Sequence, residues 1–511
     1  MTRTVPPKKE AAGPAVAKPA EAHPAEVRPD EAAPGAVARF VRGRWLGTVP
    51  GRIRLHAVLA LGAVGVLLLL LAATVGNARD AVRTIGHDAG PQVVATGNLY
   101  FALSDMDAHV ADVLLIGREH GLGIGRDESL RQYETRRDEA GQAAIEAAQL
   151  AGQDADRQKT VREVLQALGR YDRLVGEALL LSRQSGHAAG ETPKPVIDAY
   201  RQATDLMRME LLPRAYNLTL DSGATVRQEY EEKRGAVQAG RAWVVLAGVA
   251  ALAVLLAAQL YLARTFRRAV NPALALATAG TLLLLGAAVG MLNGQLDHLR
   301  KAKEDGFDSV LTLSRIRAIS HSAFADESRY LLDPERADTY EQNFLDKALA
   351  IAYVDPGESR PLNLDTYYAL IGRTAAEYPS ASGDTRFLGL FATEAAKADE
   401  AGAEPRLAAV LRAYARVMDG DRRMRELATG DRRDEAIALR MRRESGGAIA
   451  EFERYDAGLV GLATLHRQRF QDAIGSADGG LRGWGALPPA AGAVLAALIL
   501  AGVRPRLAEF R

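Results

Sequence analysis

The polar residues whose types and spacing favour chemistry gather in one stretch near residue 110. Asp105, His109 and Asp112 are four and then three positions apart, which places them on one face of a helix, with Asp107 and His120 nearby. Carboxylates and an imidazole at this spacing could bind a cation or the ammonium group of a ligand, and the imidazole could respond to pH. The alternative interpretation is a solvated polar stripe opposite the apolar face of the same helix.

A second candidate face follows from a weak internal repeat. One common shift superposes the first apolar segment of the chain on the third and places residues 108–115 on residues 325–332. We interpret this agreement as a duplicated unit of membrane anchor, helical bundle and second anchor. Asp326 and Glu327 then correspond in position to the first cluster, and they join it as a candidate partner or ligand face.

The sequence contains no motif for a chemical reaction. It has no glycine-rich phosphate loop, metalloprotease helix motif, nucleophile elbow or kinase signature. The absence of cysteine excludes disulfides, thiolate metal sites and cysteine nucleophiles. The 64 basic and 63 acidic residues give no overall field that would attract nucleic acid. We therefore expect no enzymatic activity, no catalytic residues, no metal and no other cofactor.

Four apolar segments predict the elements that position these residues. They cover residues 56–76, 242–263, 269–296 and 486–503, and each is close to or above the roughly 20 residues that a membrane-crossing helix needs. None of them contains Asp, Glu, Lys or Arg, which disfavours an ion-coupled carrier.

The turn at 264–268 joins the two middle segments into a membrane hairpin. It carries Arg264, Arg267 and Arg268 without any acidic residue, and such a bias in a short loop marks the cytoplasmic side. These arginines are therefore the candidate surface through which a signal would reach a cytoplasmic partner.

The remaining segments follow from this orientation. Residues 1–37 lack aromatic side chains and predict a disordered cytoplasmic tail, and residues 38–55 form a basic juxtamembrane segment. Residues 504–511 predict a short cytoplasmic C-terminus. Residues 77–241 and 297–482 then lie outside the cell membrane.

Both external segments have the apolar periodicity of helices. Glycine and proline breaks divide the first into four helices, the last of which is expected to run past a kink at Pro213 into the second apolar segment. In the second segment we expect breaks at Asp333–Pro334, Asp355–Gly357, Ser382–Asp384, Gly402–Pro405 and Gly420–Gly430. The predicted fold is an all-α integral membrane protein with four transmembrane helices and two tandem extracytoplasmic four-helix-bundle-like domains. A homodimer is a candidate assembly.

Several motifs resemble the GlnX-type membrane proteins of actinobacteria. The likeness covers most of the chain after about Arg44 and is carried by residues 50–55, 98–105, 114–117, 326–333 and 504–511. The resemblance implies an adaptor that links an extracytoplasmic glutamine-binding lipoprotein, GlnH, to the Ser/Thr protein kinase G in the cytoplasm and reports amino-acid availability. More broadly, the halves look like the four-helix sensor modules of chemoreceptors and histidine kinases, from which the chain departs in lacking a cytoplasmic signalling domain.

We therefore expect a signalling adaptor whose partners are a solute-binding lipoprotein outside and a Ser/Thr kinase or its adaptor inside. Two rival functions stay open. The first is a sensor that binds a small molecule directly, which a buried polar pocket between helices would favour over an exposed groove. The second is a structural scaffold of the cell envelope.

Overall fold

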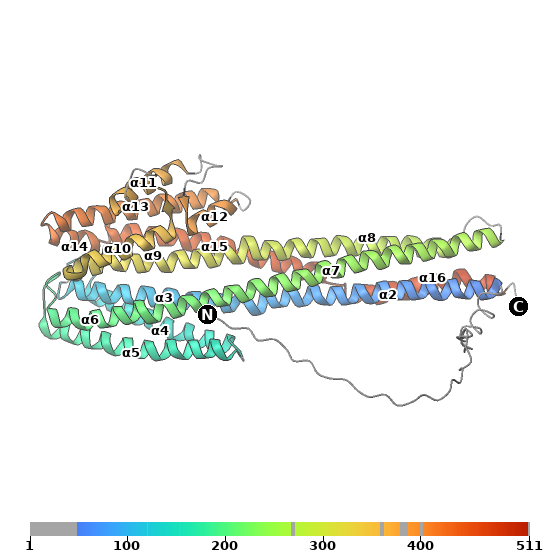
Figure 1. Cartoon of the computed structure of the whole chain (residues 1–511), viewed down its shortest axis with the longest axis horizontal. Coiled ribbons are helices and arrows are strands. Elements are labelled where there is room, and N and C mark those ends of the chain that lie inside the picture. Colours follow the sequence, from blue (N-terminus) through green and yellow to red (C-terminus); the bar gives the residue numbers. More distant parts are fainter. Residues whose placement is uncertain are drawn as a thin grey trace, which may run out of the picture.

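A computed structural model describes residues 49–119, 121–152, 154–266, 271–357, 362–378, 387–398 and 402–508. The molecule is a long assembly of nearly parallel helices, with the external segments at one end and the apolar helices at the other (Figure 1). The tail 1–37, most of the basic segment 38–55, the residues Arg267 and Arg268, and the chain end 509–511 lie outside the described residues.

The first half of the chain contains six α-helices and two π-helical segments among its described residues. In chain order these are α2 (Val49–Arg83), a π segment (Thr84–Ala89), α3 (Gly90–Ile116), α4 (Arg126–Leu150), α5 (Ala155–Ser185), α6 (Lys194–Leu206), a π segment (Met207–Leu211) and α7 (Leu212–Phe266). The turns between α3, α4, α5 and α6 confirm the four predicted helices of this external segment.

The second half is more finely divided. Its elements are α8 (Pro272–Lys301), a π segment (Ala302–Phe307), α9 (Asp308–Leu332), a 3₁₀ turn (Pro334–Arg336), α10 (Ala337–Ile351), β1 (Tyr353–Val354), α11 (Leu364–Glu377), β2 (Phe387–Leu388), α12 (Leu390–Ala398), α13 (Glu404–Thr429), α14 (Arg433–Met441), α15 (Ala448–Leu481) and α16 (Leu487–Ala508). The two short strands pair antiparallel, with Tyr353 opposite Leu388.

Four helices of the described chain are long and apolar enough to cross a membrane. They are Val49–Gly86, Lys194–Thr265, Pro272–Leu332 and Leu487–Pro505. This confirms the four predicted apolar helices. Their apolar ends, in α2, α7, α8 and α16, form one four-helix bundle whose core includes Leu71, Leu255, Leu292 and Ile499.

Three of these helices, α2, α7 and α8, run without a turn from the bundle of apolar helices into the external part. The helix from Lys194 reaches Thr265, as predicted, and a π segment immediately precedes Pro213. Proline lacks a backbone N–H and its ring clashes with the carbonyl four residues earlier, so a widened π turn accommodates it without ending the helix. In the fourth span the connection is different, because a turn with Gly483 at φ +83° separates α15 from α16.

The break predicted over Gly420–Gly430 falls only at the end of that range. Helix α13 passes through Gly420 and ends at Thr429, with Gly430 as its C-cap. Tyr414, Val417 and Met424 of α13 are buried in the shared core, and this burial outweighs the roughly 1 kcal/mol that an internal glycine costs a helix. The breaks at Asp333 and before Glu404 are confirmed, and Ser382–Asp384 lies outside the described residues.

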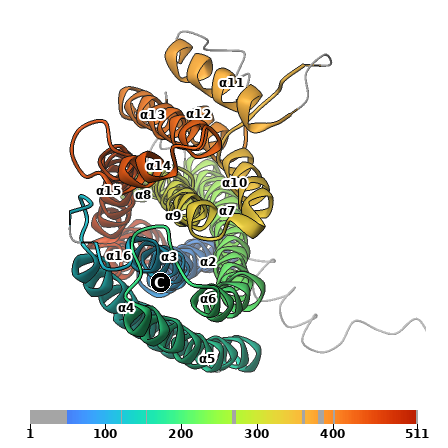
Figure 2. The ribbon, with the colours of Figure 1, turned by 90° about the vertical axis from the view of Figure 1, so that its left-hand side faces the viewer.

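The two external segments share one hydrophobic core instead of forming separate bundles. Helices α3 and α9 pack against each other at the centre, and the other external helices surround this pair (Figure 2). Every residue from Ser320 to Arg329 on α9 is buried, and most of α3 from Leu99 to Ile116 is buried as well. Their polar side chains therefore face neighbouring helices and not solvent.

Candidate ligand-binding site

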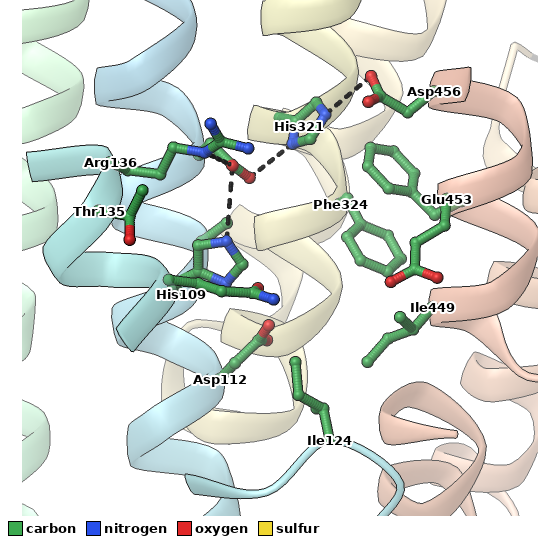
Figure 3. Close-up of a pocket in the computed structure, with 14 residues that line it drawn as sticks. His109, Asp112, Ile124, Thr135, Arg136, His321, Phe324, Ile449, Glu453 and Asp456 are labelled. Atoms are coloured by element: carbon green, nitrogen blue, oxygen red, sulfur yellow. Dashed lines mark hydrogen bonds and ion pairs between the residues drawn. The ribbon is translucent and has the colours of Figure 1, made fainter. Parts of the chain in front are cut away.

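A cavity of about 280 Å³ lies between the two halves of the chain, beside the central helix pair (Figure 3). Helices α3 and α4 contribute one wall, and α9 and α15 contribute the other. Its lining residues are Asp105, Ala108, His109, Asp112, Ile124, Gln132, Thr135, Arg136, His321, Phe324, Ile449, Phe452, Glu453 and Asp456. The three residues of the first predicted cluster, Asp105, His109 and Asp112, thus all line one cavity.

Asp105 is the centre of the polar contacts in this cavity. Its Oδ1 accepts a hydrogen bond from His321 Nδ1 at 2.6 Å, and its Oδ2 accepts one from Arg136 Nε at 2.5 Å. On the far side of His321, Nε2 donates to Asp456 Oδ1 at 3.1 Å. The chain of groups Asp105, His321 and Asp456 therefore joins α3, α9 and α15.

Each charged group in Asp105, His321 and Asp456 stabilises the ionised form of its neighbour. Burial alone would lower the pKa of His321, but the charges and hydrogen bonds of Asp105 and Asp456 outweigh it and raise the pKa to about 9. Burial would raise the pKa of Asp105, yet His321 and His109 hold it well below its usual range. At neutral pH the cavity wall thus carries an imidazolium between two carboxylates.

His109 has a ring nitrogen with an unfilled hydrogen bond. Its Nε2 lies 3.5 Å from Asp105 Oδ2, whereas its Nδ1 is buried and has no hydrogen-bond partner among the described residues. A buried nitrogen without a partner costs stability, and a bound ligand would supply the missing contact.

Asp112 closes one end of the cavity and is itself bound on its inner side. It accepts a hydrogen bond from Ser328 Oγ, and Arg440 Nη2 lies 3.4 Å from its Oδ1. Arg440 is fully buried, stacks on Phe324 at 3.6 Å and donates to the Phe324 carbonyl at 3.0 Å. These contacts fix the position of Asp112 between the two halves.

The charges around the cavity are of both signs. The carboxylates of Asp105, Asp112, Glu453 and Asp456 face it beside the cations of Arg136 and His321. Three of these carboxylates also pair with arginines outside the lining: Asp112 with Arg440, Glu453 with Arg443 and Asp456 with Arg317. The stacked rings of Phe324 and Phe452, 4.1 Å apart, add an apolar wall. Charges of both signs beside an apolar wall suit a zwitterion.

The other two predicted residues lie elsewhere on α9. Asp326 pairs with Arg329 and Lys347, and Glu327 faces Arg440 Nε at 3.2 Å; neither lines the cavity. Arg329 also binds Asp107 of α3, which accepts hydrogen bonds from Tyr171 at 2.7 Å and Thr204 at 3.1 Å. Asp326 and Glu327 thus belong to a buried polar network that holds α3 against α9.

The interpretation of Asp105, His109 and Asp112 as a solvated stripe is wrong. Asp105 and Asp112 are each 4% exposed, because α3 is a central helix that has neighbours on every side. Periodicity analysis assumes one buried face and one solvated face, and α3 has no solvated face at this level. His120 lies outside the described residues.

The sequence does not mark the cavity residues that other helices contribute. His321 lies between two serines and Asp456 follows Glu453 and Arg454, and neither stretch forms a recognised motif. Arg136 is followed by Arg137, and adjacent charges are typical of an exposed helix face. Arg137 does pair with Asp172 at the surface, whereas Arg136 turns into the cavity.

No curated protein and no solved structure gives a significant match to the chain. One family model does match, and it covers the residues that build one wall of the cavity. Residues 81–231, which include Asp105, His109, Asp112 and Arg136, match the model of the family described as Actinobacterial sensor domain, so this stretch is similar to a sensor module.

Proposed function

We propose that this protein is a multi-pass membrane sensor that reports the availability of an amino acid outside the cell to a Ser/Thr kinase, or its adaptor, in the cytoplasm. The observation that carries the proposal is the position of the cavity. It lies between α3 and α9, and both helices lead through π-helical segments into apolar helices of the membrane-type bundle. A ligand there contacts both halves of the sensor at once.

The cavity chemistry suits the two charged groups of an amino acid. The ammonium group would lie near Asp112 and Glu453, the two lining carboxylates that His321 does not contact. The carboxylate would lie near Arg136 and the unpartnered Nδ1 of His109. A volume of about 280 Å³ is slightly below the range of pockets for drug-sized molecules, as expected for a small metabolite.

The proposed signal is a shift between two arrangements of the helices. Moving such an equilibrium from one tenth to nine tenths occupancy requires about 2.6 kcal/mol of differential ligand binding, which a few charge-assisted hydrogen bonds can supply. The π segments Thr84–Ala89 and Ala302–Phe307 both pack closely against α15. A Cβ added at Gly86 would lie 2.8 Å from Ile474, and a Cβ added at Gly306 would lie 2.7 Å from Phe470. We infer that α15 couples the two joints.

The proposal retains the duplicated origin of the two halves. The π segments Thr84–Ala89 and Ala302–Phe307 occupy equivalent places, each between an apolar helix and a central external helix. This correspondence supports a repeated unit of anchor and bundle. In this proposal the two halves arose by duplication, and their helices now pack into one shared core.

The proposed output lies at the opposite end of the molecule. With both termini in the cytoplasm, Arg264 at the exposed end of α7, together with Arg267 and Arg268, would present a basic surface to the kinase or its adaptor. A solute-binding lipoprotein that docks on the external part is the alternative source of the signal. The cavity favours direct binding of the ligand.

The experiment is a binding measurement on the full chain in lipid nanodiscs. L-glutamine, L-glutamate and L-aspartate are titrated by calorimetry into the wild type and into the variants Arg136→Gln and Arg137→Gln. We expect at least one amino acid to bind the wild type and Arg137→Gln equally, and to bind Arg136→Gln about tenfold or more weakly. If none of the three binds until a solute-binding protein is added, the lipoprotein route is correct and the direct route is wrong.

A further inference from the structure

A second cavity lies on the other side of the central helix pair. It has a volume of about 360 Å³ and lies among α3, the π segment before α7, α7, α9 and α10. Its lining residues are Tyr100, Arg208, Leu212, Pro213, Tyr216, Ile319, Ser322 and Lys347. His321 and Ser322 are consecutive residues of α9, and they line the first and the second cavity respectively.

The charges of this second cavity are the reverse of those in the first. Arg208 and Lys347 line it, and Arg315 reaches its edge through a hydrogen bond to the Tyr216 hydroxyl. No carboxylate is among the lining residues, and Lys347 shares Asp326 with Arg329. Cations therefore exceed carboxylates around this space.

Arg208 and Arg315 have no hydrogen-bonded acidic partner in the described part of the chain. Arg208 is half-buried, and its charge acts on Asp326 without a direct ion pair. The buried Nε of Arg315 has no partner among the described residues. Arg208 belongs to the π-helical segment Met207–Leu211, and π segments interrupt helices frequently at functional sites. A guanidinium beside a cavity without a direct acidic partner can bind the carboxylate of a ligand.

The neutral groups of the cavity also suit an anion. Burial and the neighbouring Tyr216 raise the pKa of Tyr100 to about 12, so its hydroxyl keeps its proton at neutral pH. The Tyr216 hydroxyl accepts from Arg315, which leaves its own proton free to donate. Leu212, Pro213 and Ile319 provide an apolar surface next to these donors.

We propose that this second cavity binds a small organic monocarboxylate, with the carboxylate on Arg208 and the Tyr216 hydroxyl and the aliphatic or aromatic part against Leu212, Pro213 and Ile319. The flat, two-oxygen geometry of a carboxylate matches the guanidinium fork. The inference is independent of the proposed function, because the two cavities share no lining residue.

Lys347 connects this second cavity to the central helix pair through hydrogen bonds. Lys347 donates to Asp326 and to the Ser322 carbonyl at 3.1 Å, and Asp326 binds Arg329, which reaches Asp107 of α3. An anion that draws Lys347 toward itself changes the partner of Asp326 within this network. Carboxylate binding would thus bias the packing of α3 on α9, the helix pair whose other polar contact, between Asp105 and His321, lines the first cavity.

The test uses the full chain in nanodiscs, with benzoate and propionate as probes and inorganic phosphate as the contrasting anion. Melting temperature and calorimetry are compared for the wild type, Arg208→Gln, Tyr216→Phe and the matched control Arg214→Gln, whose side chain pairs with Glu210 and Glu163 on the surface. We expect saturable carboxylate binding in the wild type and in Arg214→Gln. Affinity should fall about tenfold in Arg208→Gln and severalfold in Tyr216→Phe.

Three results would overturn the assignment. The first is no saturable binding of either carboxylate to the wild type, and the second is equal binding by Arg208→Gln with an unchanged circular dichroism spectrum. The third is binding of phosphate but not carboxylate. The variant His109→Ala locates the effect, because unchanged carboxylate binding places it in the second cavity and lost binding places it in the first.

Discussion

Asp105 of α3 and His321 of α9, 216 residues apart in the sequence, are joined by a hydrogen bond of 2.6 Å across the boundary between the two halves of the chain. His321 continues the connection to Asp456 of α15 at 3.1 Å. The polar contact at the centre of the external part is therefore also part of the wall of the cavity. A ligand bound there would act on a contact that already links the halves.

The first prediction concerns the cost of removing His321. The variant His321→Ala removes the shared partner of Asp105 and Asp456, although Asp105 keeps Arg136 and Asp456 keeps Arg317. Leaving a buried charge without any partner costs about 3–5 kcal/mol, so the free energy of unfolding, measured in detergent with urea, should fall by less than that amount. The variant His109→Ala is the control, because His109 makes only the 3.5 Å contact to Asp105. Equal losses in both variants would contradict a central role for His321.

The second prediction concerns pH. The folded protein raises the pKa of His321 from 6.5 to about 9, so the stability that its proton contributes is fully present below pH 6.5 and is lost as pH rises through 9. The carboxylates of Asp105 and Asp456 have lowered pKa values and stay ionised throughout this window. The melting temperature of the wild type should fall between pH 6.5 and 9.5 more than that of His321→Gln. Parallel curves would refute this assignment.

The third prediction concerns the joint between α8 and α9. A Cβ at Gly306 would lie 2.7 Å from the Cβ and 2.9 Å from the Cα of Phe470, so Gly306→Ala must displace the backbone of α15. We expect a lower melting temperature and a weaker signalling response. Gly294→Ala in α8 is the matched control, since nothing lies within 4 Å of its added methyl group. It should be neutral or slightly stabilising. Indistinguishable variants would exclude a tight contact at this joint.

The fourth prediction concerns membrane topology. Gly190 and Gly402 both lie in turns with positive φ, where an inserted reporter disturbs no helix. Alkaline phosphatase fused after either residue should be active, and green fluorescent protein fused at the same points should stay dark. A fluorescent fusion at either position would place that segment in the cytoplasm and contradict two external segments.

The sequence predicted the elements better than it predicted their association. Runs such as residues 66–71 identify apolar helices without knowledge of their neighbours, and Gly117, Gly152 and Gly186 end helices by local backbone geometry. The packing of α3 on α9 depends on contacts between residues some 216 positions apart, which no local pattern records. Three residues of the cavity could be predicted because one helix carries them, whereas His321 and Asp456 could not.

The proposed signal is tested most directly by a distance measurement between the ends of two apolar helices that are predicted to face the cytoplasm. The chain contains no cysteine, so spin labels attach only at the introduced residues Val49→Cys on α2 and Thr265→Cys on α7, both of which are exposed sites. The full chain in nanodiscs is measured by pulsed electron resonance with and without the amino acid that binds most tightly of L-glutamine, L-glutamate and L-aspartate. We predict a ligand-dependent change in the distance distribution that persists in Arg137→Gln and disappears in Arg136→Gln. An unchanged distribution at saturating ligand would contradict the claim that filling the cavity moves the membrane helices.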